Sequence, residues 1–290
     1  MKRALAFLCS LLFVALQAHG EPIVDAVSRI VIPVSDLDHA ANFYASALSF
    51  EAGEDGAAPG VMRPGTEVIQ LVPAGGRKLP ADSRSNDRWL QHLAIVVSDI
   101  DRAYAQILRA GATSISAGPQ TLPAWNPNAG GIRAVYFRDL DGHPLELIQF
   151  PPGKGAPRWQ EKDRLFLGID HTAIAAGDTG RSLAFYRDHL GLHVVGISEN
   201  WGMEQERLSG VPGAHVRITT LRADRGPGIE LLDYRMPRDG RPMPPDTTAD
   251  DLWAEQIVLR ASRLPVAGQT SRDPDGHAVR FVADGKEVLR

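Results

Sequence analysis

The stretch that decides the fold reads His92-Leu-Ala-Ile-Val-Val-Ser-Asp99, and its layout recurs at Arg29–Asp36 and at His171–Asp178. In each copy an apolar run leads to an aspartate seven residues after the first position. Such a run predicts a strand, and aspartate is a preferred residue at a helix N-cap. The sequence therefore predicts three strands that each lead directly into a capped helix.

The segments after these aspartates have helical periodicity. Apolar residues recur at mixed three- and four-residue spacing over 37–48, 100–110 and 179–190. Two of these helices carry a Phe-Tyr pair that begins seven residues after the aspartate, at Phe43-Tyr44 and Phe185-Tyr186. The shared offset indicates an internal repeat, and we interpret both pairs as core residues that pack against a sheet.

Further strands close each repeat, and we expect them at 68–72, 144–150, 229–234 and 278–282. Matching turns precede two of them, Asp139-Leu-Asp-Gly-His143 and Asp273-Pro-Asp-Gly-His277, where Asp-Gly favours a tight reversal. A fourth repeat begins near Trp253-Ala-Glu-Gln256, but no helical stretch follows it. We therefore expect four modules, beginning near residues 29, 92, 171 and 253, of which the fourth is trimmed.

Residues 1–20 predict a secretory signal peptide. Lys2 and Arg3 precede an apolar run over 4–16, and small residues up to Gly20 suit cleavage after that position. The run has 13 residues and is too short to span a bilayer. Cys9 lies within it and follows a leucine, where a lipoprotein signal needs a small residue. We expect a periplasmic or secreted protein with no membrane anchor after cleavage.

Composition indicates a globular protein that binds a small molecule. The 290 residues are 43% hydrophobic and 23% charged, which is enough for one large domain or two ordinary ones. A net charge of −4 without a charged block argues against a nucleic-acid partner. The proline- and glycine-rich seam at 151–157 predicts domains at 24–152 and 167–290 joined by a linker at 153–166. A monomer and a homodimer both stay open.

These modules resemble those of the vicinal oxygen chelate superfamily, which includes glyoxalase I, the extradiol dioxygenases, methylmalonyl-CoA epimerase and the fosfomycin and bleomycin resistance proteins. The most specific stretches are Phe185-Tyr-Arg-Asp-His-Leu-Gly-Leu192 and Tyr136-Phe-Arg-Asp-Leu-Asp-Gly-His-Pro-Leu-Glu-Leu147. The chain departs from the family at Ser49, where glycine is usual, and in module four. The resemblance implies an α+β fold of βαβββ modules whose curved mixed sheets pair around a cavity.

The resemblance also implies positions for the ligands of one divalent metal ion. Carried over by register, the opening-strand and closing-strand positions are Arg29 and Gln70 in module one, His92 and Glu146 in module two, His171 and Glu230 in module three, and Gln256 and Arg280 in module four. The inner modules thus offer imidazole and carboxylate, which suit Zn²⁺, Ni²⁺, Mn²⁺ or Fe²⁺. A guanidinium in each outer module has no lone pair to offer.

Two pairings of the modules are open. If module one faces two and module three faces four, each cavity contains one His, one Glu, one Gln and one Arg and is a poor metal site. If module two faces three, one cavity receives both His and both Glu, the set that glyoxalase I-like proteins present. We favour the second pairing, because two-module relatives build each site between two chains, and fusion of two such chains end to end produces it.

The implied activity is that of a metal-dependent lyase or isomerase of the glyoxalase I type. Its substrate would be a small molecule with two adjacent oxygens, and Glu146 or Glu230 would act as general base toward a C–H beside a carbonyl. One alternative is a ring-cleaving or other dioxygenase of the same superfamily. Another is a non-catalytic protein that binds or sequesters a small molecule. An exported protein is not expected to use a glutathione adduct made in the cytosol.

The remaining polar residues receive structural interpretations. We expect the other histidines of the mature chain in turns or on helix and strand surfaces, namely His39, His143, His189, His193, His215 and His277. Arg29 and Arg280 are expected at the surface or in ion pairs, although both also suit a substrate carboxylate. The loop at 125–131 is either an ordinary long loop or a lid over the inner cavity.

Overall fold

A computed structural model describes residues 23–53, 57–261 and 269–283. The predicted signal peptide, with Cys9 and the cleavage position after Gly20, falls outside these ranges. Within them, no helix is both long enough and apolar enough to cross a membrane.

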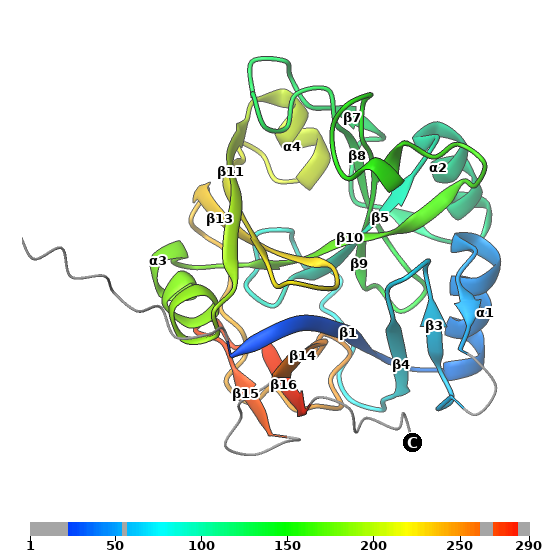
Figure 1. Ribbon diagram of the computed structural model, residues 1–290, viewed down its shortest axis with the longest axis vertical. Helices are drawn as coiled ribbons and strands as arrows, with labels where there is room; N and C mark the ends of the chain where they lie inside the picture. Colours follow the sequence, from blue (N-terminus) through cyan, green and yellow to red (C-terminus); the bar gives the residue numbers. More distant parts are fainter. Residues whose placement is uncertain (1–22, 54–56, 262–268, 284–290) are drawn as a thin grey trace, which may run out of the picture.

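Two mixed sheets make up the fold (Figure 1). The strands of the first are β1 (Val24–Val34), β2 (Glu51–Ala52), β3 (Val61–Arg63), β4 (Ile69–Pro73), β14 (Gln256–Ala261), β15 (Thr270–Arg272) and β16 (Ala278–Ala283). Their order is β15-β16-β14-β1-β4-β3-β2, so this seven-stranded sheet combines modules one and four. In Figure 1 the blue strand β1 lies beside the orange and red strands of the C-terminal module.

The second sheet combines modules two and three. Its strands are β5 (Gln91–Val97), β6 (Thr113–Ser114), β7 (Gln120–Thr121), β8 (Arg133–Arg138), β9 (Pro144–Gln149), β10 (Phe166–Ala175), β11 (His193–Trp201), β12 (His215–Arg222) and β13 (Gly228–Met236). Their order is β11-β12-β13-β10-β5-β9-β8-β6, and β7 pairs with β8.

The favoured pairing of modules is confirmed, and the pairing of sequence neighbours is wrong. In the centre of each sheet two opening strands run antiparallel, β5 with β10 and β1 with β14. Each sheet therefore takes one module from either side of the predicted linker at 153–166. The division of the chain into two domains at that linker stays a prediction.

Three helices begin where the sequence predicts, namely α1 (Leu37–Leu48), α2 (Ile100–Arg109) and α3 (Thr179–Leu183) with its π-helical continuation η2 (Ala184–His189). The 3₁₀-helix η1 (Pro157–Gln160) and α4 (Met203–Ser209) were not predicted. The carboxylates of Asp36, Asp99 and Asp178 cap the first three by accepting hydrogen bonds of 2.9–3.1 Å from the backbone N–H three residues further on.

The end of α1 explains one departure from the family pattern. Ser49 terminates this helix with φ 57° and ψ 33°, in the left-handed region. Glycine reaches that region without a steric penalty from Cβ, whereas serine does not. Ser49 therefore adopts a backbone conformation that glycine favours, although it carries a side chain.

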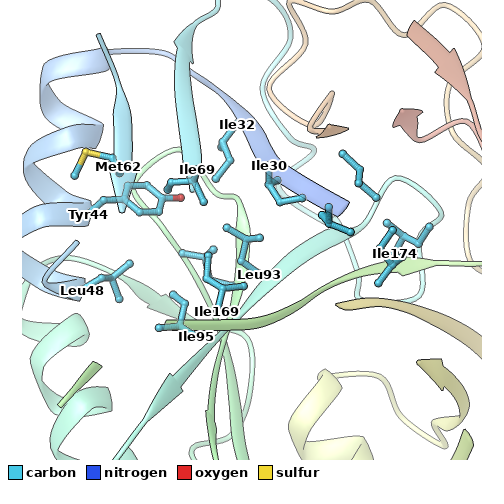
Figure 2. Close-up of a cluster of buried hydrophobic side chains, with 14 of the residues drawn as sticks. Ile30, Ile32, Tyr44, Leu48, Met62, Ile69, Leu93, Ile95, Ile169 and Ile174 are labelled. Atoms are coloured by element: carbon cyan, nitrogen blue, oxygen red, sulfur yellow. The ribbon is translucent and has the colours of Figure 1, made fainter. Parts of the chain in front are cut away.

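The main core lies between the two sheets. Ile30, Ile32 and Ile69 of the seven-stranded sheet approach Leu93 and Ile95 of β5, and all five are at most 1% exposed (Figure 2). Successive side chains of a strand alternate between its faces. Ala94, which lies between Leu93 and Ile95, and His92, which precedes Leu93, therefore point to the opposite face of the nine-stranded sheet.

The two tyrosines of the repeated Phe-Tyr pairs pack in the core and also form hydrogen bonds between modules. Tyr44 donates a hydrogen bond to Asp139 Oδ2 at 3.0 Å, and Tyr186 donates one to Asp273 Oδ2 at 3.1 Å. Both tyrosines are fully buried. Each aspartate begins one of the two Asp-x-Asp-Gly-His turns, so each pair ties the helix of one module to the turn of the next.

The histidines of these turns lie in the turns, as predicted, but they are buried, which was not expected. His143 is fully buried, with Nδ1 2.8 Å from Asp139 Oδ2 and Nε2 2.8 Å from the Leu252 carbonyl oxygen. His277 is 2% exposed, and its Nε2 lies 3.4 Å from the Ala175 carbonyl oxygen. They are turn residues, but they connect the turns to neighbouring modules inside the protein.

Candidate metal centre

The positions matched by register are equivalent in all four modules. In each, the closing-strand residue pairs with the residue two places after the opening-strand position; the pairs are Val31 with Gln70, Ala94 with Glu146, Ala173 with Glu230 and Val258 with Arg280. Residues two apart on a strand share a face. The two candidate ligands of every module therefore point to the same face of their sheet.

The antiparallel pairing of β5 with β10 brings the inner candidates together. His92 Nε2 lies 3.1 Å from Glu146 Oε2, and His171 Nε2 lies 3.5 Å from the same oxygen. One ligand atom from each of these three buried residues lies within 4.8 Å of the other two. Glu230 stands at the edge of this group, with Oε2 3.3 Å from His171 Nε2.

These separations fit one divalent cation. Two ligands about 2.1 Å from an ion lie about 3.0 Å apart at a right angle and about 3.4 Å apart at a tetrahedral angle. The observed separations run from 3.1 to 3.5 Å. Imidazole nitrogen and carboxylate oxygen are also suitable donors for Zn²⁺, Ni²⁺, Mn²⁺ and Fe²⁺. Both the geometry and the donor set are therefore suited to a metal ion.

The group is strongly coupled electrostatically. Burial acts to raise the pKa of Glu146, but the hydrogen bonds from His171 and His92 outweigh it and lower that pKa to about 2. Burial acts to lower the pKa of His171, but the charge of Glu230 and the contacts with Asp170 and Glu146 raise it well above its ordinary value. Each buried charge thus depends on its neighbours.

Three residues behind His171 were not predicted from the sequence. Asp170 Oδ2 lies 3.1 Å from His171 Nδ1. Its other oxygen accepts hydrogen bonds from Trp159 Nε1 at 3.1 Å and from Arg222 Nη2 at 2.9 Å. An acidic residue directly before a candidate ligand is a signal in the sequence, but Trp159 in η1 and Arg222 in β12 have no sequence pattern that links them to it.

A β-bulge turns Asp170 toward the site. Ile169 pairs with Ile95 of β5, whereas His171 pairs with the adjacent Ala94, so Asp170 is the extra residue. Neighbouring side chains on a regular strand would point to opposite faces. The bulge interrupts this alternation and allows Asp170 to reach the ring of the residue that follows it.

A cavity of about 670 Å³ opens in front of the group. Glu146, His171 and Glu230 line one part of it, together with Asp170 and Arg222. The rest of the lining is mostly apolar and comes from both inner modules and from the segment that joins them; it includes Leu122, Ile132, Ile148, Phe150, Trp159, Val195, Ile197, Leu208 and Ile218. This volume is within the range of small-molecule sites.

The loop at 125–131 forms part of the cavity wall. Asn128 and Ala129 line the cavity, and Asn126 Nδ2 donates to Asn200 Oδ1 of β11 at 2.6 Å. The rings of Trp125 and Trp201 stack with their centroids 4.0 Å apart. The loop of module two is therefore attached to the edge strand of module three across the cavity.

The outer positions differ from expectation in one respect. Arg29 is 4% exposed, and its Nε donates to Gln70 Oε1 at 3.0 Å. A surface position for Arg29 is therefore wrong. The structure brings together the two polar residues of module one as it does the ligand pairs of the inner modules, but with a guanidinium and an amide in place of imidazole and carboxylate.

Paired βαβββ modules with a His-Glu-His group in the sheet that two of them share define a protein of the vicinal oxygen chelate class. Residues 26–147 and 168–289 both match the family model of the Glyoxalase/Bleomycin resistance protein/Dioxygenase superfamily. The chain therefore belongs to this superfamily.

Solved structures agree on the fold. Glyoxalase I from Zea mays is 15% identical, with a TM-score of 0.56 over 89% of this chain and 92% of that chain. A putative dioxygenase from Bacillus subtilis is 14% identical, with a TM-score of 0.52 over 91% of this chain and 87% of that chain. Virulence protein STM3117 of Salmonella typhimurium is 26% identical over 128 residues, 44% of this chain and 86% of that protein. At these identities the two structures show the fold alone.

Proposed function

We propose that this protein is a metal-dependent lyase or isomerase of the glyoxalase I type. The observation that carries the proposal is the convergence of His92, Glu146 and His171 from two modules at a cavity of small-molecule size, with Glu230 beside them. These residues would hold one divalent ion, which when bound supplies a Lewis acid for two adjacent oxygens of a substrate.

Glu230 is the better placed general base. Glu146 lies between two imidazoles that lower its pKa to about 2, and a carboxylate with a low pKa is a weak base. Glu230 lines the cavity, contacts His171 alone of the two imidazoles, and accepts a hydrogen bond from Thr220 Oγ1 at 2.7 Å. We therefore propose that Glu230 removes the proton from the substrate carbon beside a carbonyl.

The cavity favours an uncharged, largely apolar substrate. Its wall away from the carboxylates is mostly aliphatic and aromatic. The two arginines that line it already face carboxylates, Arg158 with Glu67 at 2.8 Å and Arg222 with Asp170 at 2.9 Å. A substrate with several carboxylates would compete with these ion pairs, which agrees with the expectation that a cytosolic glutathione adduct is not the substrate.

Metal content and turnover test this proposal. Purified protein should bind about one Zn²⁺, Ni²⁺, Mn²⁺ or Fe²⁺ per chain, and His92→Ala and His171→Ala should each weaken that binding by at least about tenfold. Glu230→Gln should keep the metal but lose turnover of an uncharged 2-oxo aldehyde adduct. The exposed His189→Ala is the control. A protein that binds none of these ions but still binds apolar probes would instead be a non-catalytic binding protein.

One observation favours a second candidate function, that of a dioxygenase. The group of three consists of two histidines and one carboxylate, which is the ligand set of non-haem Fe²⁺ oxygenases. The role of Glu230 separates the two candidates. If Fe²⁺-loaded Glu230→Gln still consumes O₂ with a vicinal diol, and wild type does not turn over the 2-oxo aldehyde adduct, the protein is a dioxygenase and the lyase proposal is refuted.

We also propose that the protein is exported after cleavage behind Gly20 and works in the periplasm or outside the cell, without a membrane anchor. The apolar run at 4–16 supports this proposal. Both halves of the cavity come from one chain, so a monomer has a complete site. The mature protein should begin at Glu21, which N-terminal sequencing of exported material will show; an intact N-terminus would contradict export.

A further inference from the structure

We propose that Asp170 is a positioning residue that fixes the ring of His171 for metal binding, and that this support exists in only one half of the site. The inference rests on the proposed metal site. It starts from the β-bulge in β10, because that bulge places the carboxylate of Asp170 and the imidazole of His171 on the same face of the sheet.

The contact defines which ring nitrogen of His171 faces the site. Asp170 Oδ2 lies 3.1 Å from Nδ1, while Nε2 lies 3.5 Å from Glu146 Oε2 and 3.3 Å from Glu230 Oε2. An ionised carboxylate only accepts hydrogen bonds, so Nδ1 carries the proton and donates it. The lone pair of a neutral ring is then at Nε2 and points to the position where a metal would bind.

Asp170 is itself held in place. It is 9% exposed, and its Oδ1 accepts from Trp159 Nε1 and from Arg222 Nη2. The ion pair with Arg222 offsets the cost of placing a third carboxylate near Glu146 and Glu230. Trp159 comes from the segment between modules two and three, so that segment takes part in organising the site.

Within the part of the chain that the structure describes, His92 has no equivalent support. β5 pairs residue by residue with β10 and contributes no extra residue to the pairing. The residue before His92 is Gln91, whose side chain donates to Thr172 Oγ1 at 3.2 Å. Nδ1 of His92 is buried and has no hydrogen-bond partner among the residues that the structure describes.

The outer sheet shows that the carboxylate is not a consequence of the bulge alone. β1 has the same irregularity, since Val27 pairs with Leu259 and Arg29 pairs with Val258. The extra residue there is Ser28, directly before Arg29. This irregularity therefore recurs in modules one and three, but the extra residue directly before the matched opening-strand position is acidic in module three and a serine in module one.

Asp170→Asn tests the inference directly. Its amide nitrogen can donate toward Nδ1 and so favours the wrong tautomer of His171, while the side-chain volume stays the same. We expect Zn²⁺ and Co²⁺ to bind about 10–100-fold more weakly, measured by calorimetry on metal-free protein. Asp139→Asn is the matched control, because Asp139 contacts His143 Nδ1 in the same way at 2.8 Å outside the cavity lining. It should lower stability and leave metal affinity within about twofold.

A second readout needs no metal and is decisive in the wild type alone. In protein labelled with ¹⁵N-histidine, we expect a slowly exchanging Nδ1–H proton for His171, shifted downfield in wild type and lost or moved upfield in Asp170→Asn. A wild-type His171 without a proton on Nδ1 would overturn the inference, even if the variant failed to fold. So would an Asp170→Asn protein that is folded and binds Zn²⁺ as tightly as wild type.

These outcomes separate the inference from the proposed function. If wild type binds neither Zn²⁺ nor Co²⁺, the proposed metal-dependent function fails, and the Nδ1–H resonance alone decides whether Asp170 orients the ring. If wild type binds metal and the Asp170→Asn substitution does not weaken metal binding, the proposed metal site is supported and the positioning role of Asp170 is wrong.

Discussion

The buried turn histidine His143 should make the protein lose stability at alkaline pH. Both ring nitrogens face acceptors at 2.8 Å, Nδ1 the carboxylate of Asp139 and Nε2 the carbonyl oxygen of Leu252. Only the protonated ring donates from both nitrogens. Deprotonation therefore removes one of two hydrogen bonds and the ion pair inside the protein.

The size of the effect follows from the pKa. Burial acts to lower the pKa of His143, but the charge of Asp139 and the hydrogen bond to it raise that pKa from 6.5 to about 9. Because the folded value is the higher one, this stabilisation is complete below pH 6.5 and is lost as the pH rises through 9. At about 1.4 kcal/mol per pKa unit, the loss is about 3 kcal/mol.

A second buried group acts in the same direction. Burial raises the pKa of Glu255 from 4.5 to about 8; the charge of His143 acts to lower it, and the charge of Asp139 adds a smaller increase. Because the folded protein favours the protonated form of Glu255, the free energy of unfolding falls as the pH rises from about 4.5 through about 8. Between pH 6.5 and 9.5 both groups therefore contribute, and Glu255→Gln separates them.

Thermal unfolding followed by tryptophan fluorescence measures the loss. For a domain of this size about 1 kcal/mol corresponds to about 2–4 °C, so the His143 contribution predicts a fall in Tm of about 6–12 °C between pH 6.5 and 9.5. His143→Gln should flatten this dependence, and the exposed His189→Gln should not. Parallel pH profiles for wild type and His143→Gln would refute the reasoning.

Two further predictions concern the contacts between modules. Tyr44→Phe and Tyr186→Phe each remove a hydrogen bond to a buried aspartate and should each lower the free energy of unfolding by about 1–3 kcal/mol in urea titrations. Tyr104→Phe removes a solvent-exposed hydrogen bond to Ser114 and should change that free energy by less than about 0.5 kcal/mol. Asp87→Asn should lower the free energy of unfolding by about 2–4 kcal/mol, because the Asp87 carboxylate is fully buried and lies 2.7 Å from Nη2 of Arg241. Asp239 forms its ion pair at the surface, so Asp239→Asn should lower that free energy by less than about 1 kcal/mol. Equal losses for the two variants would contradict this prediction.

Several elements were predictable because their causes are local. The aspartates that cap α1, α2 and α3 act on backbone groups three residues away, so their position in the sequence is enough to predict where each helix begins. The register of the candidate ligands was predictable for a related reason. A repeat conserves the spacing between strand and turn, and strand side chains alternate with a period of two.

Other features had no local cause. The last turns of the third helix are π-helical, and α4 follows a strand without a predicted cap. The burial of His143 and His277 in their predicted turns was not expected, because nothing near them in sequence shows that Leu252 and Ala175 accept their hydrogen bonds from more than 100 residues away. The burial of Arg29 likewise depends on distant residues, because β14 and β4 pair with β1 on its two sides.

The sequence by itself determined the four-module repeat, the caps and the two histidines and two glutamates that share one register, because each depends on spacing along the chain. Only the tertiary structure decided that module two shares a sheet with module three, and that the bulge at Asp170 places a carboxylate behind one imidazole. Strand pairing joins residues that are far apart in sequence, and a bulge exists only relative to the partner strand, so neither is written in the spacing of a single segment.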